Sequence, residues 1–196
     1  MNELLGLAGF ALVGTITPGP NNALLLASGI RFGFGRTVPH VAGTALGMSV
    51  LILAVAAGVG ALLLAVPAAG LALKVAGSVY LLVLAYRIAS SRGRTGAVAA
   101  RPFGVVQAAA FQLANLKGWL FAVAAVSTFR PAGLAPLTGM LAVTATCAVV
   151  ILATASVWAA GGAALDGSAD GGRAQRAISL ALALVLAASV LLIWLR

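Results

Sequence analysis

The chain has 196 residues, of which 62% are hydrophobic and only 8% are charged, and its mean hydropathy is +1.13. A soluble domain of this length cannot hide so much apolar surface, so the composition excludes that class and indicates an all-α, multi-pass protein of the lipid bilayer. The net charge of +9 does not indicate nucleic-acid binding, because the basic residues lie at the ends of apolar runs and form no stripe with interleaved aromatic residues.

Six apolar segments are each long enough to cross a bilayer as a helix. They cover residues 4–29, 41–65, 67–87, 104–128, 136–160 and 177–195, with ends defined only to within several residues. The longest connections between them, 88–103 and 161–176, are too short to fold alone. The sequence therefore predicts one transmembrane domain over residues 1–196, without a soluble module.

The first segment is interrupted near its centre by a polar, proline-containing sequence, Thr17-Pro18-Gly19-Pro20-Asn21-Asn22. Pro18 and Pro20 lack amide hydrogens, so the carbonyls of Gly14 and Ile16 lose their helical donors. A helix broken within the membrane is tolerated only where its loosened backbone faces protein or water. We therefore expect a polar substrate site here. The freed carbonyls suit an ammonium group, and the amide end of the helix that restarts after Pro20 suits a carboxylate.

The two halves of the chain, about 1–90 and 104–196, each hold three predicted spans. Because three is an odd number, the second half must insert upside down relative to the first, which is the arrangement of inverted-repeat transporters. The polar sequence Asn115-Leu116-Lys117-Gly118 lies near the centre of the fourth span, at the depth of Pro18 in the first. The sequence thus predicts a 3+3 inverted repeat whose first and fourth helices are broken.

Lys117 lies within the fourth span with about 12 apolar residues on either side. A lysine at this depth costs on the order of 2.5–3.5 kcal/mol on insertion scales, so it should face the bundle interior. None of the predicted spans has an acidic residue in its interior. We expect Lys117 to receive a substrate carboxylate; the alternative is a lysine that bonds backbone carbonyls or extends to an interface.

Four amide side chains occupy otherwise apolar helices, and they either bind substrate or join helices by hydrogen bonds. They are Asn21, Asn22, Gln112 and Asn115. His40 lies where the first loop enters the second span, and it is either an ordinary interfacial histidine or a group that titrates and gates transport.

Gly43, Gly47 and Gly58 predict close helix packing. Cys147 is the single cysteine, no Cys/His cluster offers a metal site, and no catalytic constellation is present. The sequence thus predicts a protein that is not an enzyme and has no metal or cofactor.

Basic residues are distributed unevenly between the two sides of the predicted bundle. Eight lie in or beside the first, third and fifth loops, and three lie on the other side: Arg31, Arg36, Arg87, Arg92, Arg94, Arg101, Arg173 and Arg176, against Lys74, Arg130 and Arg196. The positive-inside rule then places the odd-numbered loops, including 88–103, in the cytoplasm and both termini outside it.

Four segments together resemble the LysE/RhtB family of amino-acid exporters. They are Pro18-Gly19-Pro20-Asn21, the glycines 43 and 47, Ala76-Gly77-Ser78-Val79-Tyr80-Leu81, and the stretch from Phe111 to Phe121 with Asn115 and Lys117. The chain departs from the family pattern at Leu116, where the family has a proline, so the fourth helix is expected to be less sharply broken.

The resemblance implies export of a small amino acid or related metabolite across the bacterial inner membrane, driven by a proton or ion gradient. The residues expected at the site are Thr17, Pro18, Gly19, Pro20, Asn21, Asn22, Gln112, Asn115 and Lys117, with Tyr80 closing it from the third span. Export of another metabolite or a cation, and an accessory membrane subunit without transport, remain alternatives. A membrane enzyme has no motif in its favour. The oligomeric state stays open, and a homodimer is compatible with the sequence.

Overall fold

The computed structural model describes residues 2–59, 65–90, 101–129, 131, 133–166 and 172–195, and within these ranges it contains helices and no strand. The all-α prediction is confirmed for this part of the chain. The helices are α1 (Asn2–Ile16), α2 (Pro20–Ala56), α4 (Pro67–Ser90), α5 (Val105–Ala114), α6 (Leu116–Thr128), α7 (Pro136–Asp166) and α8 (Gly172–Trp194).

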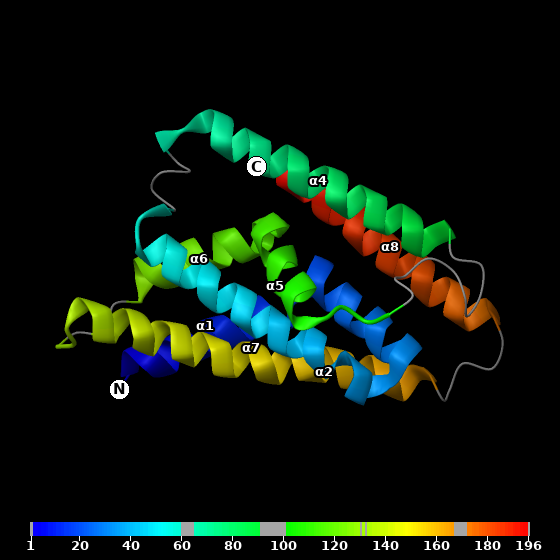
Figure 1. Ribbon diagram of the computed structural model, residues 1–196, viewed down its shortest axis with the longest axis horizontal. Helices are drawn as coiled ribbons and strands as arrows, with labels where there is room; N and C mark the ends of the chain where they lie inside the picture. The colour runs from blue at the N-terminus through cyan, green and yellow to red at the C-terminus, as the bar shows by residue number, and fades with distance from the viewer. Residues whose placement is uncertain are drawn as a thin grey trace.

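The helices form two layers around the short helices α5 and α6 (Figure 1). In one layer, α2 packs along α7, and α1 also packs against α7. In the second layer, α4 and α8 lie side by side. Helix α5 packs against α2, and α6 continues from it in the middle of the molecule. The centre of the bundle is therefore built from the ends of short helices.

Helix α2 is folded back on itself at Gly33. This residue has φ +76° and ψ 170°, a conformation that glycine adopts without strain. Ser28 and Thr37 lie on either side of it, and their hydroxyl oxygens are 2.9 Å apart. Nine residues of straight helix would separate them by roughly 13 Å, so the chain must reverse. The predicted first loop, between residues 29 and 41, is thus much shorter in the structure, and α2 supplies two arms of the bundle.

Among the residues that the structure describes, three helices are long and apolar enough to cross a membrane: Pro20–Ala56, counted as one helix despite its fold at Gly33, Gly70–Ser90 and Pro136–Leu165. The α5–α6 pair, bent by 78°, gives a fourth if it is counted as one broken span. The stretches Glu3–Ile16 and Leu180–Leu191 are shorter apolar helices. Many large apolar side chains are exposed on the outside of the bundle, with Val106 at 81% and Leu184 at 69%, as lipid contact requires. The chain is thus a multi-pass membrane protein, while the six-span inverted repeat stays a prediction.

Glycines let α5 approach α2 closely. A Cβ added at Gly43 or Gly47 would collide with the α5 backbone, at Val105 and Ala109 respectively, so the predicted close packing is confirmed at both positions. The same prediction is wrong for Gly58. That residue has φ +100° and open space around an added Cβ, because it terminates α2 with a left-handed backbone rather than packing against a neighbour.

Candidate functional site

The first break lies where the prolines predict it. Helix α1 ends at Ile16 and α2 begins at Pro20. Proline suits the first position of α2, because the amide at that position has no acceptor within the same helix. Gly19 is extended, with φ −173° and ψ 176°. A Cβ added at Gly19 would lie 3.0 Å from Cδ of Lys117. The glycine therefore makes room for this lysine to approach the break.

The two carbonyls that the prolines free have donors within the protein. The Thr17 hydroxyl donates to the Gly14 carbonyl over 3.0 Å. The indole Nε1 of Trp158 on α7 donates to the Ile16 carbonyl over 3.2 Å. Each of the two carbonyls that we expected to suit a substrate ammonium thus already accepts one hydrogen bond within the protein.

Lys117 joins the first break to the second. Its Nζ donates to the Thr17 carbonyl (2.8 Å) and the Thr17 hydroxyl (2.9 Å), and it lies 3.4 Å from the Pro18 carbonyl. Asn22 Nδ2 donates hydrogen bonds to the carbonyls of Thr15 (2.7 Å) and Thr17 (2.8 Å). The carboxyl end of α1 is thus held by a cation and an amide.

The second break occurs at Asn115, without a proline. Asn115 has φ −89° and ψ 94°, outside the helical region, and α5 and α6 meet there at 78°. The Asn115 carbonyl accepts from the amides of Gly118 (2.8 Å) and Trp119 (3.2 Å), which starts α6. The Trp119 indole donates to the freed Leu113 carbonyl over 2.9 Å. Leu116 therefore does not soften the break as expected, since side chains stabilise it.

A chain of amides connects the two breaks. Asn21 Oδ1 accepts from Gln112 Nε2 (2.9 Å) and from the Thr44 hydroxyl (3.3 Å). Gln112 Oε1 in turn accepts from Asn115 Nδ2 over 3.0 Å. The three amide side chains are between 1% and 8% exposed. Residues 91 positions apart in the sequence thus form one buried polar network in an apolar bundle.

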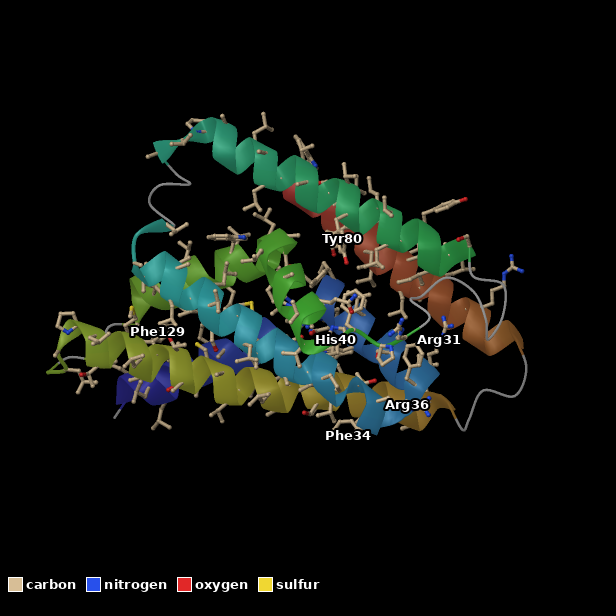
Figure 2. All side chains as sticks on the ribbon, viewed as in Figure 1. Arg31, Phe34, Arg36, His40, Tyr80 and Phe129 are labelled. Atoms are coloured by element: carbon tan, nitrogen blue, oxygen red, sulfur yellow. The ribbon has the colours of Figure 1, made fainter. Side chains whose placement is uncertain are left out.

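A cavity of about 50 Å³ lies between the breaks. It has room for a few water molecules, so it suits small polar groups. Helices α1, α2, α5, α6 and α7 all contribute to its wall, and its polar lining consists of Thr15, Asn21, Asn22, Thr44, Gln112, Asn115, Lys117 and Thr154. A second cavity, of about 500 Å³, is lined by apolar residues and lies near Phe129 toward one end of the bundle (Figure 2). The smaller cavity is therefore the candidate polar site.

Seven of the ten residues predicted for the site line this cavity: Gly19, Pro20, Asn21, Asn22, Gln112, Asn115 and Lys117. The other three are not among its lining residues. Thr17 contacts Lys117 from the break, and Pro18 is exposed. Tyr80 is 39% exposed on α4, and its ring packs 5.6 Å from that of Phe111 (Figure 2).

Sequence reasoning did not select Thr44 or Thr154. The Thr154 hydroxyl lies 2.9 Å from that of Thr15, so it ties α7 to the first break. A lone threonine in an apolar helix usually bonds the carbonyl four residues earlier, and both of these threonines also do so. Nothing in their sequence context distinguishes them.

His40 is not interfacial, and that prediction is wrong. It is 1% exposed, neither of its ring nitrogens has a hydrogen-bond partner, and its ring lies 5.1 Å from that of Phe103. Figure 2 shows it inside the bundle beside the start of α5. The fold of α2 at Gly33 brings this residue inward, because the second arm begins earlier than expected.

Replacing His40 with leucine is expected to leave the protein as stable as before or to stabilise it by about 1–3 kcal/mol, the cost of leaving a buried polar group unpaired. Thermal unfolding of the purified protein in detergent would measure this. A marked loss of stability would show that the imidazole makes a bond absent from this structure.

Comparison with known proteins bears directly on this arrangement. The sequence profile of the LysE type translocators matches residues 12–193, which includes both breaks and every residue that lines the polar cavity. The chain belongs to the LysE type translocator family. The resemblance inferred from the four motifs is thereby confirmed, and the family is one of transport proteins rather than enzymes.

The chain is also similar to curated efflux proteins. It is 36% identical over 120 residues to proteins named cysteine/O-acetylserine efflux protein from Escherichia coli K12 and Shigella sonnei, and 35% identical to that of Escherichia coli O6:K15:H31. The match covers 61% of this chain and 62% of each relative. No solved structure gives a significant match.

Proposed function

We propose that the protein is a secondary exporter that carries a small amino acid from the cytoplasm across the bacterial inner membrane. The observation that carries the proposal is the small polar cavity between two broken helices, lined by a lysine and four amides within an apolar bundle. Membership of a translocator family supports it. The names of the relatives support cysteine or a similarly small amino acid as the substrate, although the chain aligns with only 62% of their length.

The charges around the cavity favour a zwitterion. Lys117 and the first-turn amides of α2, which no side chain caps, suit a carboxylate. The acidic residues of the chain, Glu3, Asp166 and Asp170, lie at or beyond the ends of the predicted spans. A metal cation would find no carboxylate ligand in the site, whereas an ammonium group can bind neutral oxygens. An amino acid therefore fits the lining better than a cation.

The 3+3 inverted repeat is part of the proposal. In it, α1 and the first arm of α2 form the broken first span, and α5 with α6 forms the broken fourth. At each break an indole donates to a freed carbonyl: Trp158 of α7 bonds the Ile16 carbonyl, and Trp119 of α6 bonds the Leu113 carbonyl. Rocking of one repeat against the other would expose the cavity to each side in turn.

The orientation of the protein in the membrane is also part of the proposal, and the distribution of basic residues supports it. Arg31 and Arg36 lie at the α2 turn, and the end of α4, the end of α7 and the start of α8 lie toward the same end of the bundle (Figures 1 and 2). We assign this basic end to the cytoplasm by the positive-inside rule. Both termini would then face outside. Export against a gradient also requires a driving ion, and we propose coupling to a proton or other ion gradient.

A metabolite screen tests the proposal. The gene is expressed in a bacterial host, and the amino acids in the medium are quantified. Two control cultures are measured in the same way: one carries the empty vector, and the other has an equal amount of a Lys117→Ala variant in its membranes. We expect at least one small amino acid to accumulate outside several-fold, together with tolerance of its toxic analogue. An unchanged medium despite normal amounts of protein in the membrane would favour an accessory subunit without transport.

A further inference from the structure

Asn115, one of the residues that line the cavity, has a buried side-chain oxygen without a hydrogen-bond partner. This oxygen is Oδ1, and the residue as a whole is 5% exposed. Buried oxygens are nearly always partnered in folded proteins. An unpaired acceptor at a ligand cavity therefore points to a donor that the ligand supplies.

This acceptor is also held away from its usual local partner. Asn115 is the N-cap residue of α6, where an asparagine normally accepts from a backbone amide two or three residues later. Its side chain makes no such bond here. Instead Nδ2 donates to Gln112 Oε1 over 3.0 Å, which directs the amide toward α5. The Asn115 side chain is thus held by its bond to Gln112 and does not cap α6.

The hydrogen bonds of Gln112 determine which atom of Asn115 stays free. Gln112 Nε2 faces two oxygens, Asn21 Oδ1 at 2.9 Å and the Ala108 carbonyl at 3.5 Å. Gln112 must therefore turn Oε1 toward Asn115. Asn115 therefore donates from Nδ2 to this oxygen, and its own Oδ1 remains without a hydrogen-bond partner at the end of the amide chain. A ligand that meets it must bring a donor rather than an acceptor.

The position of Lys117 determines where a positive donor of the substrate can bind. Asn115 lies between the C-terminus of α5 and the N-terminus of α6, so the opposite partial charges of the two helix ends largely cancel at this residue. The ammonium of Lys117 is directed to the other break, where it bonds the carbonyls of Thr17 and Pro18. A zwitterion would avoid placing its ammonium at Lys117 and would place its carboxylate there. The two ends of the substrate are thereby assigned to different breaks.

Resting on the proposed function, we propose that Asn115 Oδ1 receives the α-ammonium group of the transported amino acid. It thereby selects against molecules of the same size that lack an amino group. Gln112 and Asn21 position this oxygen but do not contact the ammonium. The carboxylate is received independently at the first break by Lys117 and the amide end of α2.

Competition in inside-out vesicles containing the full chain tests this assignment. Uptake of labelled L-cysteine is inhibited by L-cysteine, by 3-mercaptopropionate, which lacks the amino group, and by cysteamine, which lacks the carboxylate. In the wild type, L-cysteine should compete about 10- to 100-fold better than either analogue, as expected for one charged hydrogen bond. Asn115→Leu should bring 3-mercaptopropionate close to L-cysteine while preserving the discrimination against cysteamine.

Two further variants complete the test. Asn115→Asp loses the donor to Gln112 Oε1 but keeps an acceptor oxygen and adds a negative charge, so it should preserve the preference for the amino group. Gln107→Leu removes an exposed α5 amide outside the cavity and should reproduce the wild-type ratios. If Asn115→Leu does not reach the membrane, loss of the preference in Asn115→Asp overturns the assignment.

Failure of the proposed function and failure of the Asn115 assignment would give different results. Wild-type vesicles that take up neither L-cysteine nor any other amino acid contradict the proposed function itself. Wild-type uptake with an Asn115→Leu variant that still rejects 3-mercaptopropionate overturns the role of Asn115. Loss of discrimination against cysteamine instead would assign the carboxylate to this residue and equally overturn the inference.

Discussion

Replacing Lys117 with glutamine is expected to lower export by about 10- to 100-fold while the protein still assembles in the membrane. Glutamine keeps a donor for the Thr17 carbonyl, which accepts from Lys117 Nζ at 2.8 Å. It has no positive charge, however, with which to attract a carboxylate. The measurement is the initial export rate per amount of assembled protein, for Lys117→Gln and for Lys117→Ala.

This pair of variants separates two roles of Lys117. If it only joins the helices, Lys117→Gln should export normally, and Lys117→Ala should assemble poorly. If it binds the substrate, both should lose export, including the fraction that assembles well. Lys74→Gln is the matched control, because Lys74 lies on α4 and does not line the cavity. Unchanged export in both variants would remove Lys117 from the mechanism.

The second large effect is expected at Gly47, where even one added methyl group must displace α5. The Cβ of an alanine there would lie 2.6 Å from the Ala109 carbonyl oxygen and 2.9 Å from Cγ of Gln112. Overpacking of this kind costs about 1–3 kcal/mol. Because Gln112 carries the bonds to Asn21 and Asn115, Gly47→Ala should both lower the unfolding temperature and reduce export.

Gly9→Ala is the control for this substitution. Gly9 lies in α1 with no atom within 4 Å of an added Cβ, and alanine favours a helix over glycine by roughly 1 kcal/mol. This variant should export normally and be at least as stable as the wild type. Gly47→Ala behaving like Gly9→Ala would mean that α2 and α5 are less closely packed than the structure shows.

Both breaks were predictable from the sequence, for different reasons. Pro18 and Pro20 remove two backbone donors within three residues, so the first break is expected from covalent structure, whereas the single Pro39 lies inside α2 without ending it. The second was inferred from Asn115 and Lys117, because polar residues at mid-span require polar surroundings. Its sharpness was not predictable, since it depends on the Trp119 bond to Leu113, and side-chain bonds of this kind leave no local signature.

Other features depended on tertiary contacts and escaped sequence reasoning. His40 is buried and not at an interface, because the turn at Gly33 is shorter than the loop that the charged residues around it led us to expect. Thr44 and Thr154 became part of the cavity lining only when helices distant in sequence met there. The sequence also did not identify the hydrogen-bond partners of Lys117. In the structure they include backbone carbonyls of the first break.

The two breaks differ in what makes them permanent. At the first, Pro18 and Pro20 remove two amide donors within three residues, so the corresponding helical hydrogen bonds cannot form in any conformation of the chain. At the second, Leu116 retains its amide hydrogen, so nothing covalent prevents α5 and α6 from aligning once the bonds of Asn115 and Trp119 are exchanged. The first break therefore has a covalent cause, whereas the second is held by side-chain hydrogen bonds that can be exchanged. Straightening thus meets a smaller covalent obstacle at the second break than at the first.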